Sequence, residues 1–541
     1  MESQRTFLII GLLLVSFLLF QEWNNDYNQP QQPSAQTQQK TQSQQAGQSD
    51  VPQSDVDNSL TATAVDRKII EVTTDVFAVK IDTLGGDIIE TKLLKHAETH
   101  GSDTPYLLLG EFDGNQYFSQ SGLIGLNGPD AQAERPVYDS EKLQYTLNGD
   151  TLTVPLTFVD EQGVRFTKTY TFKQGQYDVA MDYNVENTTA APLQVQLFAQ
   201  VKRTVQEKGS LIDQSYLGGA YGTDEINYEK YSFSDIEDKQ LNKTTQGGYI
   251  AFLQHYFVSA WVPNQEQQNT VYMRLITPSV AQIGVKSEPI TVAANSTADI
   301  SATYYMGPKD TDALEAIHPN LDLAVDYGWL WFISQPLLTL LKFLYSFLGN
   351  WGLAIIAITI VVKSLLFPLT KAQYTSMAKM RALQPKMQAL KERYGDDRQK
   401  FGQAMMEMYK KEKVNPMGGC FPLLLQMPIF LALFYVFLES PELRHAEFGL
   451  WLTDLSSKDP YYVLPILFGA SMFLMQKLQP MTVTDPMQQK MMTWMPVIFS
   501  VFFLWFPSGL VLYWLVSNLI SIAQMLIIYR GMEKKGMKVR G

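Results

Sequence analysis

The sequence predicts a protein of two parts: an antiparallel β-sandwich domain and an α-helical membrane core of five spans, with one more span at the N-terminus. Two observations predict this division. Long apolar stretches lie at the start of the chain and after residue 329, whereas the segment between them alternates in polarity with a period of two. The mean hydropathy of -0.10 is too polar for a chain that is embedded in a membrane throughout.

Residues 1–23 are predicted to form an uncleaved signal anchor. Their apolar stretch, residues 7–20, follows Arg5, and Trp23 suits a membrane interface. A cleaved signal peptide remains the alternative, because an apolar stretch of this length is short for a span. Residues 24–64 are rich in Gln and Ser, so they are predicted to be a disordered linker.

Residues 65–325 are predicted to form the β-sandwich domain. Polar and apolar residues alternate in segments 76–81, 151–158, 164–172, 177–185, 193–201, 270–276 and 300–305, and glycine-containing turns separate several of them. The net charge of -11 describes this domain. A single cysteine excludes an intramolecular disulfide, so a hydrophobic core must stabilise the fold. The pair His96 and His100 lacks a third ligand, and no metal site is predicted.

Residues 326–350 are predicted to form an amphipathic helix in the membrane interface, with a spanning helix as the alternative, because Gln335, Pro336 and Lys342 interrupt an apolar stretch. The five-span core, residues 351–530, follows. Its candidate spans are residues 351–369, 421–438, 462–476, 491–506 and 510–529. The third and fourth would reach only ~22–24 Å across a hydrocarbon layer of ~30 Å, which predicts local thinning of the bilayer.

Basic residues set the predicted orientation. Lys and Arg are concentrated in residues 370–414 and in the tail, residues 531–541, and both segments are expected in the cytoplasm. Both termini are then cytoplasmic, the β-domain is periplasmic, and the protein has six transmembrane helices in the bacterial inner membrane.

Residues 370–414 are predicted to form a cytoplasmic helical hairpin. Apolar residues recur at helical spacing, Gly395 interrupts them, and Asp396 and Asp397 can cap the second arm. The two arms can pack on each other or present a binding face, and their basic residues suit anionic lipid or ribosomal RNA. The candidate contact residues are Met377, Lys379, Met380, Arg381, Met405 and Met408.

Lys363 is the candidate functional residue, because a cation inside an apolar span is costly and usually functional. Snorkelling to nearby headgroups is the alternative. Small hydroxyls in spans usually bond the backbone or a neighbouring helix. Together with a cation, however, polar residues on several spans predict a hydrated cavity. The predicted lining consists of Thr359, Gln426, Tyr513, Ser517, Ser521 and Gln524.

Four stretches resemble the YidC family of bacterial membrane protein insertases: residues 368–386, 413–434, 459–473 and 482–518. The resemblance covers nearly the whole five-span core. The N-terminal anchor and the large β-domain, similar to sugar-binding sandwiches of the supersandwich type, resemble the Gram-negative form. The resemblance implies a hydrophilic groove that is open to the cytoplasm and to lipid and closed to the periplasm, with one positive residue.

That positive residue corresponds to Lys363, where the family usually has arginine. Lysine keeps the charge but loses the planar fork of the guanidinium group. The family also implies an apolar slide for substrate helices, which falls on Met427, Phe430, Leu433, Phe502 and Trp514.

The predicted function is that of a membrane protein insertase and chaperone. It receives nascent hydrophobic segments in the groove and releases them into the bilayer, alone or with the Sec translocon, and burial of the apolar helix drives the process. The expected partners are nascent membrane proteins, the Sec translocon, the ribosome and the lipid bilayer, with no cofactor.

Two alternative functions explain fewer of these features. A solute transporter would bind an anion at Lys363, but the five spans contain no internal repeat. A membrane-anchored carbohydrate-binding module would leave the polar residues of the spans unexplained. No arrangement of catalytic residues supports an enzyme.

Overall fold

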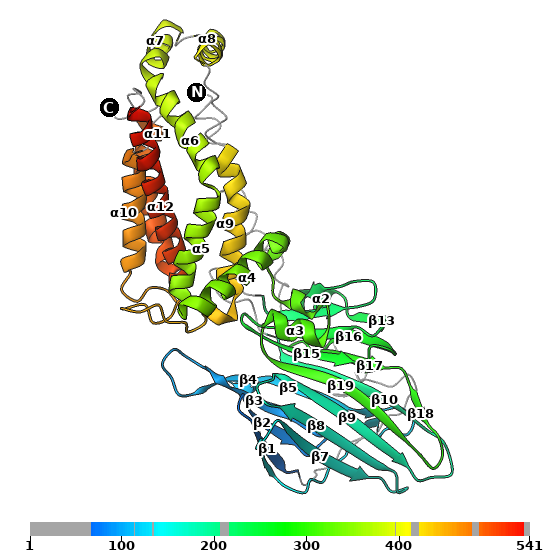
Figure 1. Cartoon of the computed structure of the whole chain (residues 1–541). Helices are drawn as coiled ribbons and strands as arrows, with labels where there is room; N and C mark the ends of the chain where they lie inside the picture. The colour runs from blue at the N-terminus through cyan, green and yellow to red at the C-terminus, as the bar shows by residue number, and fades with distance from the viewer. Residues whose placement is uncertain are drawn as a thin grey trace, which may run out of the picture. The chain divides into compact units, whose positions relative to one another are not determined.

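The computed structural model describes residues 67–112, 114–131, 135–205, 216–394, 397–412, 421–478 and 486–534. The predicted anchor and linker, residues 1–23 and 24–64, lie outside these ranges, as do residues 535–541 of the predicted tail. Strands occupy most of residues 69–308, and helices dominate the rest of the chain (Figure 1). The division into a β-domain and a helical region is confirmed.

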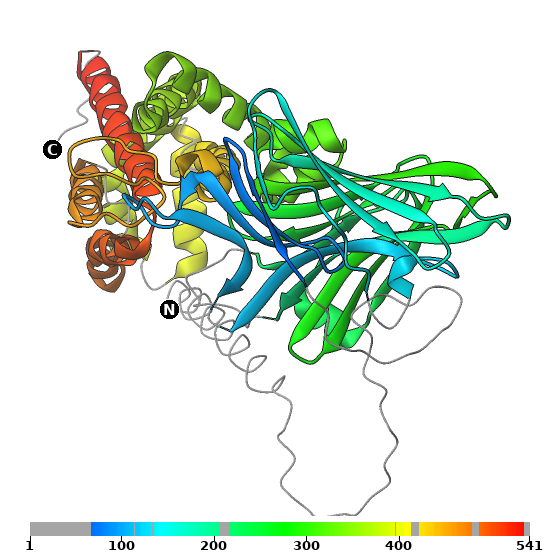
Figure 2. The same ribbon diagram turned by 90° about the horizontal axis from the view of Figure 1, so that it is seen from below.

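Two large sheets form the β-domain (Figure 2), which confirms the sandwich. The 11-stranded sheet has the order β13 (Leu241–Gln246), β16 (Gln268–Thr277), β17 (Val280–Ser287), β10 (Leu193–Thr204), β5 (Asn115–Ile124), β4 (Pro105–Phe112), β3 (Asp87–Ala97), β2 (Phe77–Asp82), β1 (Ile69–Thr73) and β6 (Gln144–Thr146), with β18 (Ile290–Val292) beside β10. The 8-stranded sheet has the order β12 (Glu229–Tyr231), β11 (Gly218–Gly222), β14 (Tyr249–Leu253), β15 (Phe257–Pro263), β19 (Ser296–Pro308), β9 (Asp178–Asn187), β8 (Arg165–Lys173) and β7 (Thr151–Val159). The described pairings are antiparallel except for β1 with β6, which is parallel.

Aromatic side chains fill the interior between the sheets. In β8, Phe166, Tyr170 and Phe172 are buried at every second position, as the alternation predicts. Trp261 of β15 stacks on Tyr304 of β19 with ring centroids 4.4 Å apart. Its indole N–H donates to the hydroxyl of Ser119 in β5 at 3.0 Å, which joins the two sheets.

Lys168 lies on the inward face of β8 and is fully buried. Its ammonium group donates to the carbonyl oxygens of Gly85, Gly86 and Ser121 at 3.0, 2.9 and 3.0 Å. Burial lowers the pKa of Lys168 to about 7, although Asp87 nearby raises it. The side chain thus fixes the turn between β2 and β3 from inside the core.

Arg135 holds the same turn from a second direction. Its guanidinium group pairs with Asp87 and with Asp130, the latter at 2.8 Å. Gly85 has a φ of +72°, and an added Cβ would lie 2.2 Å from the guanidinium carbon of Arg135. Glycine is therefore required at this position both for its backbone conformation and for the close approach of Arg135.

Strands β14 and β15 are buried on both faces. One face contributes to the sandwich, and the other belongs to an apolar cluster that continues into the helices after the β-domain. Ala251 and Val258 belong to that cluster together with Leu321, Leu338 of α4 (Trp331–Leu348) and Ile355 of α5 (Trp351–Leu365). The short helices α2 (Phe233–Asp238) and α3 (Thr311–Ile317) complete the elements of this part of the chain.

A helix lies at each of the five predicted spans. They are α5 with α6 (Phe367–Ala382), then α9 (Phe421–Glu439), α10 (Val463–Leu478), α11 (Pro486–Phe502) and α12 (Ser508–Glu533). By length and composition, α4 and α12 can each cross a membrane, and α5 with α6 can if the two count as one span. Gln426–Glu439, Val463–Leu478 and Thr493–Trp505 are shorter apolar helices. The five-span count and the interfacial position of α4 remain predictions.

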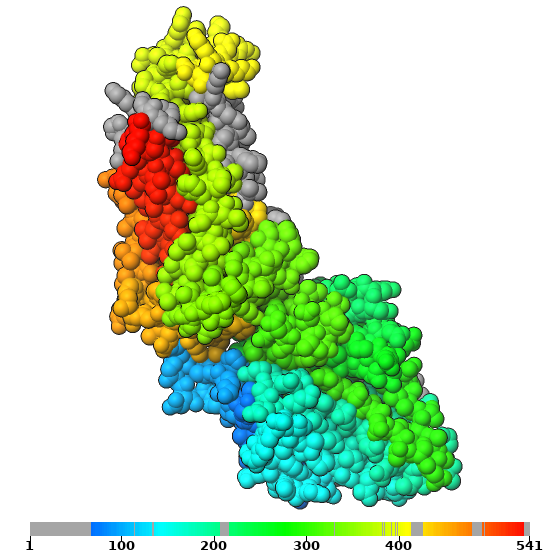
Figure 3. Space-filling model, in the orientation of Figure 1, coloured from blue at the N-terminus to red at the C-terminus, as the bar shows by residue number. Residues whose placement is uncertain are grey.

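Residues 351–369, predicted as the first span, are divided between α5 and the start of α6. The chain bends by 64° between α5 and α6. Pro368 lies just after the break and has no N–H for the carbonyl group of Ser364, so the regular hydrogen-bond pattern stops there. Figure 3 shows the surface of α12 between those of α10 and α6, and α12 contacts α10, α5 and α6.

The predicted hairpin, residues 370–414, is also corrected. Its arms are α7 (Gln384–Tyr394) and α8 (Arg398–Lys411), whereas α6 packs along α12 through Tyr374 and Ala378. Pro385 accounts for the break between α6 and α7, because it cannot donate to the preceding turn. The predicted cap of the second arm is confirmed for Asp397, whose carboxylate accepts from the N–H of Lys400 at 3.1 Å.

Candidate functional site

Lys363 lies near the end of α5, on the face that packs against α12. Thr359 lies one turn earlier on the same face, and the two residues are 7% and 1% exposed, respectively. Helices α5 and α12 pack against each other along this face. The cation is therefore enclosed between two helices.

Hydrogen bonds connect Lys363 with three residues of α12, directly with Ser521 and Gln524 and through Ser521 with Ser517. Its ammonium nitrogen donates to the hydroxyl oxygen of Ser521 at 3.0 Å, and Ser521 donates in turn to the carbonyl oxygen of Ser517 at 2.8 Å. The side-chain amide of Gln524 donates to the backbone carbonyl of Lys363 at 3.0 Å. The structure thus brings together Lys363, Ser517, Ser521 and Gln524, and we call these four residues the polar cluster.

The other predicted lining residues have different surroundings. The hydroxyl of Thr359 donates to the carbonyl of Ile355 in its own helix at 2.6 Å. Tyr513 is buried, and its ring lies 5.5 Å from that of Phe437 in α9. Gln426 is half-buried on α9. These three residues are positioned by helix packing.

The predicted slide residues divide by exposure. Met427 and Phe502 are 44% and 52% exposed, whereas Leu433 is fully buried among α9 and its neighbours. Phe430 is half-buried and stacks on Trp514 with ring centroids 5.5 Å apart. Trp514 is itself largely buried.

Aromatic rings connect this pair to the exposed Phe502. Trp514 lies 5.9 Å from Phe506, and Phe506 lies 4.9 Å from Phe502, measured between ring centroids. A continuous row of rings thus runs from α9 across α12 to α11.

The predicted hairpin residues are not brought together. Met377 of α6 packs against the α12 cluster around Met525, whereas Met405 and Met408 are half-buried on α8. Lys379 is exposed and Met380 is half-buried, both on α6; the side chain of Arg381 lies outside the described part of the chain.

Two contacts hold α7 and α8 together. The hydroxyl of Tyr409 donates to the sulfur of Met387 at 3.5 Å, and Lys386 pairs with Glu412 at 2.5 Å. The two arms therefore contact each other, which was one of the two alternatives that the sequence left open.

Sequence reasoning missed two polar contacts. Asn518 of α12 donates to the hydroxyl of Ser471 in α10 at 3.2 Å. Lys309, at the end of β19, pairs with Glu439, at the end of α9, at 3.6 Å, and both side chains are buried. Neither pair could be inferred from local spacing, because each joins residues that are distant in sequence.

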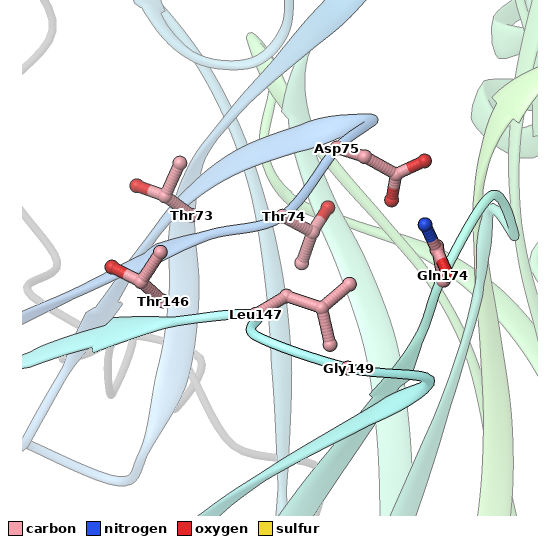
Figure 4. A pocket seen from close by; sticks show the side chains of 7 residues that line it. All are labelled: Thr73, Thr74, Asp75, Thr146, Leu147, Gly149 and Gln174. Atoms are coloured by element: carbon pink, nitrogen blue, oxygen red, sulfur yellow. The ribbon is translucent and has the colours of Figure 1, made fainter.

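The β-domain also has a polar pocket of its own, lined by Thr73, Thr74, Asp75, Thr146, Leu147, Gly149 and Gln174 (Figure 4). Two of these groups are already engaged: Asp75 accepts from the N–H of Gly175 at 3.0 Å, and Thr74 from that of Phe77 at 2.9 Å. Two of the five polar side chains that line the pocket thus bond within the domain.

Comparison with known proteins assigns the family. Residues 69–340 match the YidC periplasmic domain, and residues 343–535 match the 60Kd inner membrane protein family. The chain is 74% identical to the membrane protein insertase YidC of Pseudoalteromonas translucida, over the full length of both. The chain belongs to the YidC family of membrane protein insertases.

Further YidC proteins are similar to this chain. The YidC of Shewanella piezotolerans is 54% identical over 99% of this chain and 100% of its own length. Among solved structures, an active YidC insertase crystal structure with the first transmembrane domain resolved matches 86% of this chain and 93% of its own, with 19% identity and a TM-score of 0.38.

Membership of the YidC family confirms three predictions made from the sequence. The chain is an inner-membrane protein with a periplasmic β-domain, its family consists of insertases rather than enzymes, and it acts on nascent membrane proteins. The solute transporter has no support among these relatives.

Proposed function

We propose that this chain inserts nascent membrane proteins by attracting the polar flank of a hydrophobic segment to Lys363. The burial of this cation between α5 and α12 is the observation that carries the proposal. A positive charge in a weakly polar environment attracts a carboxylate far more strongly than it would in water. The Ser521 hydroxyl is the only partner described for the ammonium group, and it is neutral, so the charge of Lys363 stays available to a substrate.

The hydrophobic segment then enters the lipid along the row of rings from Phe430 to Phe502. Burial of about 20 apolar residues supplies the driving force without a nucleotide. Thr359, Gln426 and Tyr513 extend the polar cluster into a groove that is open to the cytoplasm and to lipid and closed to the periplasm. Met427 and Phe502 contact the substrate directly, whereas Leu433 supports the slide from behind.

The proposal keeps the domain boundaries that were predicted from the sequence. Residues 1–23 form the anchor, 24–64 the linker, 65–325 the periplasmic domain, 326–350 the interfacial helix, 351–530 the core and 531–541 the cytoplasmic tail. With the anchor, the protein has six spans and both termini are cytoplasmic. A helix as short as α10, at ~1.5 Å per residue, supports local thinning of the membrane.

The hairpin of α7 and α8 contacts the ribosome and anionic lipid, and the Sec translocon receives or delivers segments at the core. The exposed Lys379, together with Lys410 and Lys411 in the last turn of α8, supports such contacts. These lysines can bind phosphate groups of lipid or RNA as point charges.

Replacement of Lys363 tests the proposal. Insertion of a single-span substrate with an acidic flank should be retained in Lys363→Arg, fall about tenfold or more in Lys363→Ala, and fall further in Lys363→Glu. Protease protection of the translocated flank in proteoliposomes measures insertion.

Lys477→Ala is the matched control, because Lys477 is an exposed lysine at the end of α10, near the ring of Phe473. This variant should insert normally. Unchanged insertion in all three Lys363 variants would rule out the electrostatic step.

A further inference from the structure

Gln524 carries an unsatisfied hydrogen-bond acceptor in the polar cluster. The residue is 8% exposed, and its Oε1 has no hydrogen-bond partner in the described part of the chain. A buried acceptor without a donor costs free energy, and native proteins rarely leave one unless it has a role.

The orientation of this amide is determined by its other end. Nε2 donates to the carbonyl oxygen of Lys363 at 3.0 Å. Rotation of the amide by half a turn would bring Oε1 against that carbonyl, so that two acceptors would face each other. The unsatisfied atom is therefore the oxygen.

The remaining members of the polar cluster cannot replace this acceptor. An ammonium group has three donors and no acceptor, so Lys363 recognises only acceptors such as carboxylates and carbonyls. The Ser521 oxygen already accepts from Lys363 and donates to Ser517. A donor group that arrives beside Lys363 therefore finds its acceptor at Gln524.

We propose that Gln524 binds hydrogen-bond donors of the translocating flank, namely amide side chains and peptide N–H groups, beside the site where Lys363 binds carboxylates. This inference rests on the proposed function and names the substrate chemistry of the same site. The two residues together bind the hydrogen-bonding groups of a polar flank: Lys363 binds its acceptors, and Gln524 binds its donors. An uncharged flank is thereby handled as well as an acidic one.

Two substrates with the same hydrophobic segment test this proposal, one with an Asn-containing flank and one with Asp at the same positions. Gln524→Met keeps the length of the side chain and removes the acceptor. It should lower insertion of the Asn flank about threefold to tenfold relative to the Asp flank. Protease protection in proteoliposomes, normalised to the amount of reconstituted protein, measures both.

Gln524→Glu separates binding from structural support. It keeps an acceptor but loses the donor to the Lys363 carbonyl, and it adds a negative charge beside the cation. We expect insertion of the Asn flank to be retained and that of the Asp flank to fall. Retention of the Asn flank in Gln524→Glu, against its loss in Gln524→Met, would assign the effect to the acceptor oxygen, because both variants lose the donor to the Lys363 carbonyl.

Asn518→Leu is the matched control, because Asn518 is an amide of the same helix that bonds to Ser471 instead. It should leave the ratio of the two flanks unchanged. Equal loss of both flanks in Gln524→Met, or no loss, would overturn the inference while leaving the role of Lys363 intact. Failure of the unaltered protein to insert either flank would instead contradict the proposed function.

Discussion

Single residues hold the β2–β3 turn of the β-domain in place. Arg135 and Lys168 reach the turn from inside the core, and Gly85 leaves room for the guanidinium group. A side chain at Gly85 would have to displace a buried, paired cation, which is among the most costly changes that a core can undergo.

Gly85→Ala should therefore lower the stability of the β-domain by about 3–5 kcal/mol. Gly101→Ala is the control: Gly101 has nearly the same φ, +74°, but no atom lies within 4 Å of an added Cβ. It should cost only about 1–2 kcal/mol, the strain of the backbone alone. Hydrogen exchange of the β2 and β3 amides in the full-length protein measures both, and equal effects would show that the approach of Arg135 is unimportant.

At the scale of single elements, the bend between α5 and α6 lies directly after the polar cluster. Gln524 reaches the Lys363 carbonyl at the end of α5, where the helix is about to break. Pro368→Ala should restore the missing N–H and straighten the pair. Spin labels at the exposed positions 353 and 379 would then move apart by ~5 Å, because a straight helix rises ~1.5 Å per residue.

Thr370→Ala provides the comparison for this distance. It removes a hydroxyl that bonds to the Leu366 carbonyl at 3.1 Å but leaves every backbone donor in place. The label distance should not change. An unchanged distance in Pro368→Ala would show that packing of α6 on α12, rather than the proline, produces the bend.

The sequence predicted correctly those elements that have one buried and one exposed face. Strands such as β8 alternate because one face is buried and the other is not, and Lys363 stood out because its neighbours are aliphatic. It failed for β14 and β15, whose residues are buried on both faces and so show no alternation. It also missed the breaks before Pro368 and Pro385, because the apolar pattern continues across both of them.

Within the candidate site, spacing predicted the shared face of Ser517, Ser521 and Gln524, but not which atom each would bond. The hydroxyl of Thr359 donates to its own helix, and the side-chain nitrogen of Gln524 donates to a backbone carbonyl. The bonding partner of each side chain depends on the distances between helices. The spacing of residues along one helix gives no information about these distances.

At the scale of the whole molecule, a cluster of basic side chains connects β3 with the loop after α9. Arg444 donates to the carbonyl of Glu98 at 3.1 Å, and its guanidinium group lies 5.3 Å from the centre of the Phe257 ring. Burial, together with the nearby charges of Arg444 and His445, lowers the pKa of His96 to about 4. His96 is therefore neutral in the folded protein at neutral pH.

This pKa predicts an acid-sensitive contact. The ordinary pKa of histidine is about 6.5, so between pH 6.5 and 4 the open state binds a proton that the folded state excludes. The contribution of His96 to stability is complete above pH 6.5 and is lost as the pH falls towards 4. Amides of β3 around His96 should have lower protection factors at pH 5 than at pH 7.5, after correction for the intrinsic dependence of exchange on pH.

His96→Gln should reduce this dependence on pH at the β3 contact. His318→Gln is the control, because His318 also has a lowered pKa through burial but packs on Tyr249 instead. It should leave exchange near His96 unchanged. A pH dependence that survives in His96→Gln would assign the effect to His445.

The buried pair of Lys309 and Glu439 links the last long strand of the β-domain to a helix that is translated much later. Lys309 is made long before Glu439, and burial of its ammonium group without this partner would leave a charge unpaired, which is strongly destabilising. The end of β19 can therefore reach its lowest free energy only after α9 has been synthesised. The β-domain, although it is translated first, is thus completed by a residue of the helical region.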